Sequence, residues 1–281
     1  MIKLIECPRD AMQGMEKFIP TESKVEYINQ LLKVGFDTID FGSFVSPKAI
    51  PQMRDTKDVL QKLNLQTKKS KLLAIVANTR GGEEACSYEA IDYIGFPLSI
   101  SETFQIRNTN KTVTEALNTV NELKGIADKN RKELVVYISM GFGNPYNDPY
   151  SPEIVMQFSE ILKAIGVHII SLADTIGAAT PQSINTLFKS LSSKHEDIEF
   201  GVHLHSHPAT AREKVLAALD AGCQRFDSAL LGLGGCPLAE DELVGNIDTQ
   251  ILLSALNEKG FDGLVDNHEL NLSVEMARQI F

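Results

Sequence analysis

The segment Glu199-Phe200-Gly201-Val202-His203-Leu204-His205 has the alternation of a β-strand that is apolar on one face. Because strand side chains repeat every two residues, its apolar residues share one face, and His203 and His205 share the other. A helical pattern over residues 209–221 follows, and Gly222 closes it before the next apolar run. The stretch therefore predicts one strand–helix unit that presents two imidazoles at the end of its strand.

The same pattern of a short strand and a longer helix recurs along the chain. Eight apolar runs are predicted as strands, namely Ile2–Glu6, Thr38–Phe41, Leu72–Ala77, Ile91–Gly95, Leu134–Ser139, His168–Leu172, Ile198–His203 and Arg225–Ala229. The clearest helical patterns are Glu22–Val34, Val113–Lys129, Pro152–Ile165, Pro181–Ser192, Ala209–Ala221 and a final Asn267–Phe281. Eight units over about 250 residues or more predict a (β/α)8 TIM barrel with an additional C-terminal helix. We expect one domain over residues 1–281. An open, doubly wound parallel sheet is the alternative, although such sheets usually have fewer strands.

Composition narrows the class of protein. The 281 residues carry 27 basic and 37 acidic side chains, which gives a net charge of −10. This balance argues against nucleic-acid binding, and no apolar run approaches the roughly 20 residues of a membrane span. The four cysteines are too sparse for a disulfide framework, and Met1–Ile5 lacks the features of a signal peptide. We therefore expect a cytoplasmic protein with neither nucleic-acid nor membrane partners.

In a (β/α)8 barrel, functional groups gather at the carboxyl ends of the strands. The sequence places polar side chains at most of these ends, namely Arg9, Asp10, Asp40, Asp174, His203, His205 and the segment Gly232–Pro237. This coincidence indicates an enzyme. Asp10, His203 and His205 are candidate ligands of a divalent metal, and Asn246 could add a carbonyl oxygen. The alternative is that the histidines only form hydrogen bonds in a polar barrel mouth.

Three further side chains have a chemical and a structural interpretation. Arg9 would hold an oxygen on which negative charge develops, or would pair structurally with its neighbour Asp10. Asp174 is an acid or base, or it caps a loop. The glycine-rich segment Gly232–Pro237 is a mobile lid whose Cys236 shuttles a proton, or a tight turn that happens to contain a thiol.

Several motifs occur in the order of one known family. They are Pro8-Arg9-Asp10 with Gln13, Ser43-Phe44-Val45-Ser46-Pro47-Lys48, Pro51-Gln52-Met53, Asp174-Thr175-Ile176-Gly177, His203-Leu204-His205 and Gly232–Pro237. Over roughly residues 5–246 the chain resembles the 3-hydroxy-3-methylglutaryl-CoA lyase family, within the DRE-type TIM-barrel superfamily. The resemblance implies cleavage of that acyl-CoA to acetyl-CoA and acetoacetate, with Mg²⁺ or Mn²⁺ as the cofactor. It also implies an acyl-CoA substrate as the partner and a place in leucine or ketone-body metabolism. A homodimer is the candidate assembly.

The resemblance assigns roles to individual residues. It implies that the metal ligands are Asp10, His203, His205 and Asn246. It implies that the catalytic residues are Arg9, Cys236, Asp40 and His203, with Arg9 on the enolate oxygen and Cys236 in proton transfer. The candidate substrate-binding residues are Arg9, Gln13, Ser43, Lys48, Arg107, Asn108 and Asp174. Within this set, charge and position assign Lys48 and Arg107 to the phosphates of coenzyme A.

The chain departs from the family pattern at three places. Asp40 stands where the family usually has Glu, Ser206-His207-Pro208 follows the second histidine, and Glu240-Asp241-Glu242 lies in a longer loop before Asn246. The alternatives are therefore a lyase for another 3-hydroxy acyl-CoA, an aldolase for a 4-hydroxy-2-oxo acid, and a condensing synthase. Two further alternatives are a zinc hydrolase and a non-catalytic barrel derived from this family.

Overall fold

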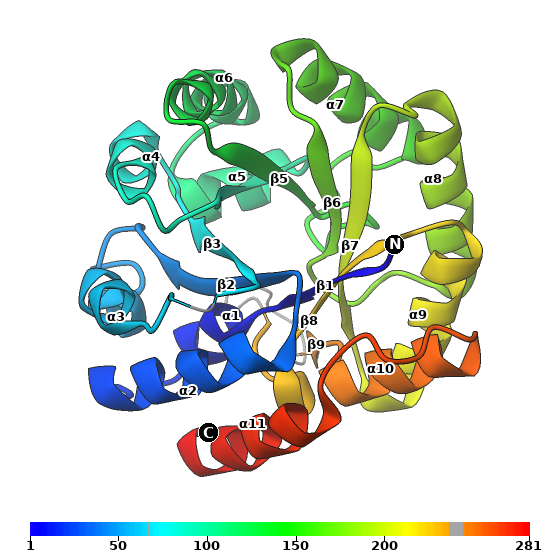
Figure 1. The fold of residues 1–281 in the computed structure, drawn as a ribbon. Coiled ribbons are helices and arrows are strands. Elements are labelled where there is room, and N and C mark those ends of the chain that lie inside the picture. The colour runs from blue at the N-terminus through cyan, green and yellow to red at the C-terminus, as the bar shows by residue number, and fades with distance from the viewer. Residues whose placement is uncertain (67, 236–243) are drawn as a thin grey trace.

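The computed structural model describes residues 1–66, 68–235 and 244–281. At its centre, eight parallel strands form a closed barrel with helices around it (Figure 1). The strands are β1 (Lys3–Glu6), β2 (Thr38–Ser43), β3 (Lys71–Ile75), β4 (Tyr93–Ser99), β5 (Glu133–Ser139), β6 (Ile169–Asp174), β7 (Glu199–Ser206) and β8 (Arg225–Ser228). Each strand pairs with the next, and β8 pairs back with β1, so the ring is closed. The predicted (β/α)8 barrel is confirmed.

Helices follow the strands around the outside of the barrel (Figure 1). They are α1 (Pro8–Gln13), α2 (Thr21–Val34), α3 (Thr56–Lys62), α4 (Thr79–Cys86), α5 (Glu102–Thr109), α6 (Val113–Lys129), α7 (Pro152–Ile165), α8 (Pro181–Lys194), α9 (Pro208–Asp220), α10 (Thr249–Glu258) and α11 (Asn267–Ile280). Two short 3-10 helices, η1 (Pro51–Met53) and η2 (Leu230–Gly232), lie in loops. The predicted C-terminal helix is α11, which packs beside α2.

Local capping explains why two predicted helices have the predicted bounds. At α6, the Thr112 side chain accepts a hydrogen bond from the backbone N–H of Glu115, and the Glu115 carboxylate accepts one in return. This capping box satisfies backbone donors that the first helical turn leaves free. At α7, Ser151 caps the first turn and Gly166 ends the helix with a φ of 93°, a conformation that glycine adopts without steric cost.

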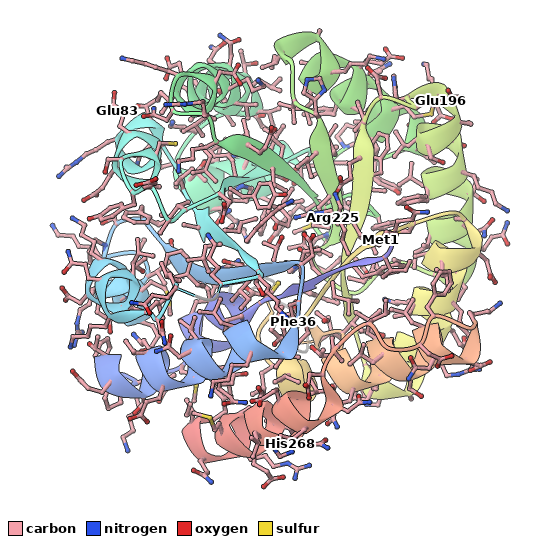
Figure 2. All side chains as sticks on the ribbon, in the orientation of Figure 1. Met1, Phe36, Glu83, Glu196, Arg225 and His268 are labelled. Carbon is pink, nitrogen blue, oxygen red and sulfur yellow. The ribbon has the colours of Figure 1, made fainter. Side chains whose placement is uncertain are left out.

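The alternation of β7 separates its two faces as the sequence predicts. Phe200, Val202 and Leu204 pack in the hydrophobic core between the barrel and the helices. His203 and His205 instead belong to the inner face, where they line a cavity. Deeper in the barrel, Figure 2 shows Arg225 among the central strands. The barrel therefore buries apolar side chains against its helices, while its interior combines polar side chains with a second apolar cluster that includes Leu73, Val135 and Ile169.

One element that positions the site is absent from the sequence prediction. The two-residue strand β9 (Gly245–Asn246) pairs antiparallel with the end of β7, which extends three residues beyond its predicted end at His203. In this register, Asn246 lies opposite His205. Across the described ranges, no helix has the length and apolar character needed to cross a membrane.

Candidate active site

Three side chains from two segments converge at the carboxyl end of the barrel. Asp10 lies in the first turn of α1, which starts directly after β1 because Pro8 favours the first helical position. His203 and His205 come from β7. Strand β8 pairs with both β1 and β7, so it lies between the two segments that supply these side chains. Ligand atoms of these three residues all lie within 4.8 Å of one another. The Nε2 atoms of the two imidazoles are 3.3 Å apart, and His203 Nε2 is 3.7 Å from Asp10 Oδ2.

Each imidazole is oriented through its other ring nitrogen. The Nδ1 of His205 lies 3.0 Å from the backbone oxygen of Thr175, which can only accept, so this nitrogen donates. The Nδ1 of His203 lies 3.1 Å from Asp227 Oδ2. These contacts leave both Nε2 lone pairs facing Asp10. Metal-binding histidines are held in this way, by a carbonyl or carboxylate on the second nitrogen.

The protonation states of Asp10 and His205 suit a cation. Burial and the neighbouring His203 lower the pKa of His205 to about 4, so this ring is neutral at pH 7. Burial also lowers the pKa of His203, but the hydrogen bond and charge of Asp227 raise it overall. Burial would raise the pKa of Asp10, yet Arg9 and the two histidines lower it, so Asp10 carries its charge.

These donors fit a divalent metal ion. One carboxylate and two imidazoles are ligands that first-row metals accept, and the cluster leaves one side open to the cavity. Asn246 adds an amide beside them: its Nδ2 donates to Asp10 Oδ2 at 2.7 Å and to the backbone oxygen of Leu233 at 2.8 Å. The residues that the sequence predicts as metal ligands are thus brought together.

Arg9 lies next to this cluster in a fixed orientation. Its Nε and Nη2 donate to the Asp40 carboxylate at 2.5–3.2 Å, while Nη1 donates to Asp10 and to Gln13. The two carboxylates raise the pKa of Arg9 further despite its burial. Burial raises the pKa of Asp40 to about 6, although the Arg9 charge opposes the rise. Asp40 is 1% exposed, so its oxygens face Arg9.

A cavity of about 310 Å³ opens above these groups. Six of the predicted site residues line it, namely Arg9, Asp10, Gln13, Asn108, His203 and His205. Apolar side chains form much of the remaining wall, namely Val45, Ala49, Ile50, Ile75, Pro97, Phe104 and Tyr137. A pocket with a few convergent polar groups on an apolar wall is the usual form of a small-molecule site.

Other predicted site residues have different surroundings. The Ser43 hydroxyl accepts a hydrogen bond from the Val45 backbone, and Lys48 is exposed. Arg107 lies over the ring of Tyr146, with 4.7 Å from its guanidinium carbon to the ring centroid.

Asp174 is held on both carboxylate oxygens. Oδ1 accepts from the Ala179 backbone at 3.0 Å, and Oδ2 accepts from Lys214 at 2.8 Å. These contacts match the loop-capping interpretation of Asp174. Cys236, the predicted catalytic thiol, lies outside the described residues, as does Glu240-Asp241-Glu242.

Sequence reasoning missed three residues that support the site. Asp227 lies against Nδ1 of His203, and the backbone oxygen of Thr175 accepts from Nδ1 of His205. Lys214 donates to the backbone oxygen of His205. Asp227 carries a signal in the sequence, because it is an acidic residue inside a predicted barrel strand. Lys214 carries none, since a lysine on an amphipathic helix is ordinarily solvent-exposed.

The fold and these groups together define a (β/α)8-barrel enzyme with a potential metal-binding Asp/His centre beside a buried arginine. Comparison with known proteins specifies the family. The HMGL-like family model matches residues 2–276. The chain is 33% identical over 270 residues to the cytoplasmic 3-hydroxy-3-methylglutaryl-CoA lyase of Rattus norvegicus, covering 96% of this chain and 78% of the relative. It is 35% identical over 251 residues to hydroxymethylglutaryl-CoA lyase YngG of Bacillus subtilis, covering 89% and 83%.

Solved structures agree with this grouping. The HMG-CoA lyase of Acinetobacter baumannii, solved in complex with coenzyme A and 3-methylmalate, matches with a TM-score of 0.91 at 30% identity. That match covers 100% of this chain and 91% of the other. The HMG-CoA lyase of Bacillus subtilis matches with a TM-score of 0.92 at 33% identity, covering 99% and 93%. The chain belongs to the HMGL-like family, whose members named here are carbon–carbon lyases.

Proposed function

We propose that this protein cleaves 3-hydroxy-3-methylglutaryl-CoA to acetyl-CoA and acetoacetate, with Mg²⁺ or Mn²⁺ as its cation. One observation carries the proposal: Asp10, His203 and His205 converge beside Arg9 at the base of one cavity. The names of the relatives at 33% and 35% identity support the same reaction. Oxygen-rich substrates suit this site because the cluster presents hard and borderline ligands with one side open.

The reaction breaks the bond between C2 and C3 of the acyl chain. The C3 hydroxyl loses its proton, C3 becomes the ketone carbon of acetoacetate, and the bonding electron pair passes to C2 as the enolate of acetyl-CoA. A divalent cation held by Asp10, His203, His205 and Asn246 would supply Lewis-acid polarisation of substrate oxygens. Arg9 would stabilise the enolate oxygen, because its guanidinium is fixed in a site that excludes most water.

His203 has one available ring nitrogen, Nε2, for two proposed roles. It can bind the cation or accept the hydroxyl proton, and its convergence with Asp10 and His205 favours cation binding, in which case we propose that the hydroxyl proton passes to solvent. Protonation of the enolate carbon is the role we propose for Cys236, on the strength of the family resemblance. Asp40 touches Arg9 rather than lining the cavity among the described residues, so we propose it as a positioning residue.

Coenzyme A would enter at the rim of the cavity. Phe104 and Asn108 of α5 form part of the wall there, and the A. baumannii relative was solved with coenzyme A bound. We propose that the exposed side chains of Lys48 and Arg107 bind its phosphates. Gln13 and Ser43 remain candidates for contact with the acyl group, whereas the carboxylate of Asp174 already has partners.

The substitution Arg9→Met tests the proposal. We expect it to retain Mn²⁺ binding and lose turnover at least a hundredfold, measured as acetoacetate release from 3-hydroxy-3-methylglutaryl-CoA. Arg212→Met is the control, since Arg212 forms an exposed ion pair with Glu258. No acetoacetate from the wild-type protein with either cation would refute the proposed reaction. Turnover of Arg9→Met within tenfold of wild type would refute the role of Arg9.

The assembly, the compartment and the exact substrate are finer parts of the proposal. We propose a homodimer in the cytoplasm, tested by light scattering of the purified protein and by imaging of a tagged chain in its host. Other 3-hydroxy acyl-CoA thioesters and 4-hydroxy-2-oxo acids, assayed in parallel, test the substrate. A higher kcat/KM for one of them would reassign the substrate within the same lyase chemistry.

A further inference from the structure

Lys214 on α9 is a buried ammonium group with three acceptors. Its Nζ donates to Asp174 Oδ2 at 2.8 Å, to the backbone oxygen of Gly177 at 3.0 Å, and to the backbone oxygen of His205 at 2.8 Å. The residue is 4% exposed. An ammonium group has three N–H donors, so these contacts use its full capacity. Lys214 is therefore held by geometry, and it in turn holds the three groups that it contacts.

All three contacts act on one metal-ligand candidate, His205. Lys214 binds the carbonyl of His205 directly, which fixes the backbone from which the imidazole projects. It also clamps both ends of the turn over residues 174–177. That turn contains Thr175, whose backbone oxygen accepts the Nδ1–H of His205. A single side chain thus sets the positions of both the ring and the group that orients the ring.

The same turn reaches the segment that carries Asn246. A Cβ atom on Gly177 would lie 2.7 Å from Cγ2 of Val244, so the Val244 side chain packs closely against the backbone of Gly177. Val244 precedes β9, in which Asn246 pairs with His205. The turn that Lys214 holds therefore contacts both His205 and the segment that leads to Asn246.

We propose that Lys214 is a positioning residue that sets the ring orientation and Nδ1–H tautomer of His205, and thereby the affinity of the site for a divalent cation. The second half of this statement rests on the proposed function, because it needs the cation. Lys214 lies in neither the cavity wall described above nor the ligand cluster. Its effect passes through His205.

The chain offers a matched control for a purely structural role. Lys24 on α2 is another buried lysine, 2% exposed, and its Nζ donates to Asp55 Oδ1 at 2.6 Å and to the backbone oxygen of Gln52. It joins α2 to the segment from η1 to α3, and its partners do not touch the histidines. Loss of either buried cation should destabilise the fold, because each leaves a buried carboxylate without its partner.

The experiment compares Lys214→Met and Lys24→Met, with Lys214→Gln as a milder variant that keeps two donors and is used where the methionine protein does not fold. Melting temperature reports stability. Titration of free Mn²⁺ by electron paramagnetic resonance reports affinity. In the metal-free protein, long-range ¹H–¹⁵N spectra of ¹⁵N-histidine samples report the tautomer of each ring.

We expect both lysine variants to lower the melting temperature. Only those at Lys214 should weaken Mn²⁺ binding, by tenfold or more, and give His205 a mixture of tautomers. Wild-type Mn²⁺ affinity and a single Nδ1–H tautomer in the Lys214 variants would overturn the proposal, as would equal weakening by Lys24→Met. If the wild-type protein binds no Mn²⁺, the proposed metal site fails, and the tautomer of His205 still decides whether Lys214 positions it.

Discussion

The substitution Asp40→Asn separates the energetic role of a buried carboxylate from its role in orienting Arg9. Asp40 accepts from Nε of Arg9 at 3.0 and 3.2 Å and from Nη2 at 2.5 Å. An asparagine side chain offers one acceptor oxygen in place of two, and its amide nitrogen would face a guanidinium N–H. The paired geometry that fixes the arginine is then lost.

The stability cost should be small because two large terms oppose each other. Removing one partner of a buried ion pair costs roughly 3–5 kcal/mol. The pKa of Asp40 rises from 3.8 to about 6, mainly through burial. The rise remains although Arg9 opposes it, so burial disfavours the ionised carboxylate by more than Arg9 stabilises it, and the neutral amide escapes that burial penalty. We therefore expect the free energy of unfolding to change by less than about 2 kcal/mol.

Turnover should respond much more strongly than stability. A guanidinium that is free to rotate misplaces its charge relative to the enolate oxygen, and a misplacement of about 1 Å can cost a hundredfold in rate. The assay is acetoacetate release, with urea unfolding measured on the same protein. Asp55→Asn is the control, because Asp55 is buried beside Lys24 away from the cavity. A kcat within twofold of wild type, or a stability loss above about 4 kcal/mol, would refute the reasoning.

Three further substitutions test other buried contacts of the protein. Asp227→Asn should weaken Mn²⁺ binding by about 10–100-fold in a metal titration, because the amide holds Nδ1 of His203 less firmly than the carboxylate. Burial raises the pKa of Glu6 from 4.5 to about 8, so the folded protein keeps a proton that the unfolded chain releases in this range. The free energy of unfolding should then fall as pH rises from 4.5 to 8, and Glu6→Gln should flatten that slope in urea titrations. Gly234→Ala should lower both stability and Mn²⁺ affinity, since φ is +92° there and the new Cβ would lie 2.6 Å from Nδ2 of Asn246.

The barrel could be predicted because its signals are local. Alternation placed the strand of His203, and side-chain caps with proline and glycine boundaries gave α6 and α7 their predicted bounds. Strand β9 has no such signal. Two residues, Gly245 and Asn246, are too few for a periodic pattern, and they form a strand only because the end of β7 is available to pair with them. Their place beside His205 is a property of the tertiary structure.

The site could be predicted in its residue types more readily than in its contacts. A carboxylate at the end of the second strand was visible in the sequence as Asp40, but whether it meets substrate or Arg9 depends on distances of a few ångströms. The structure places it against Arg9. Lys214 was invisible for a different reason. Its partners include two backbone oxygens, and no pattern of side chains reveals where backbone oxygens converge.

Acidic side chains gather at the base of the cavity around the candidate ligands. Asp10 and Asp40 both accept hydrogen bonds from Arg9, and Asp227 lies against Nδ1 of His203. The single charge of Arg9 therefore faces two carboxylates.

This excess of negative charge is visible in the neighbouring groups. Asp10 and Asp227 add to the rise in the pKa of Asp40, and one buried oxygen of Asp227 lacks a hydrogen-bond partner among the described residues. A cation at the candidate ligands would offset this negative charge, so its binding should lower the pKa of Asp40 and strengthen the pairing that holds Arg9. Cation binding and the orientation of Arg9 are then coupled through one carboxylate cluster, because the positive charge of each reduces the repulsion among these carboxylates.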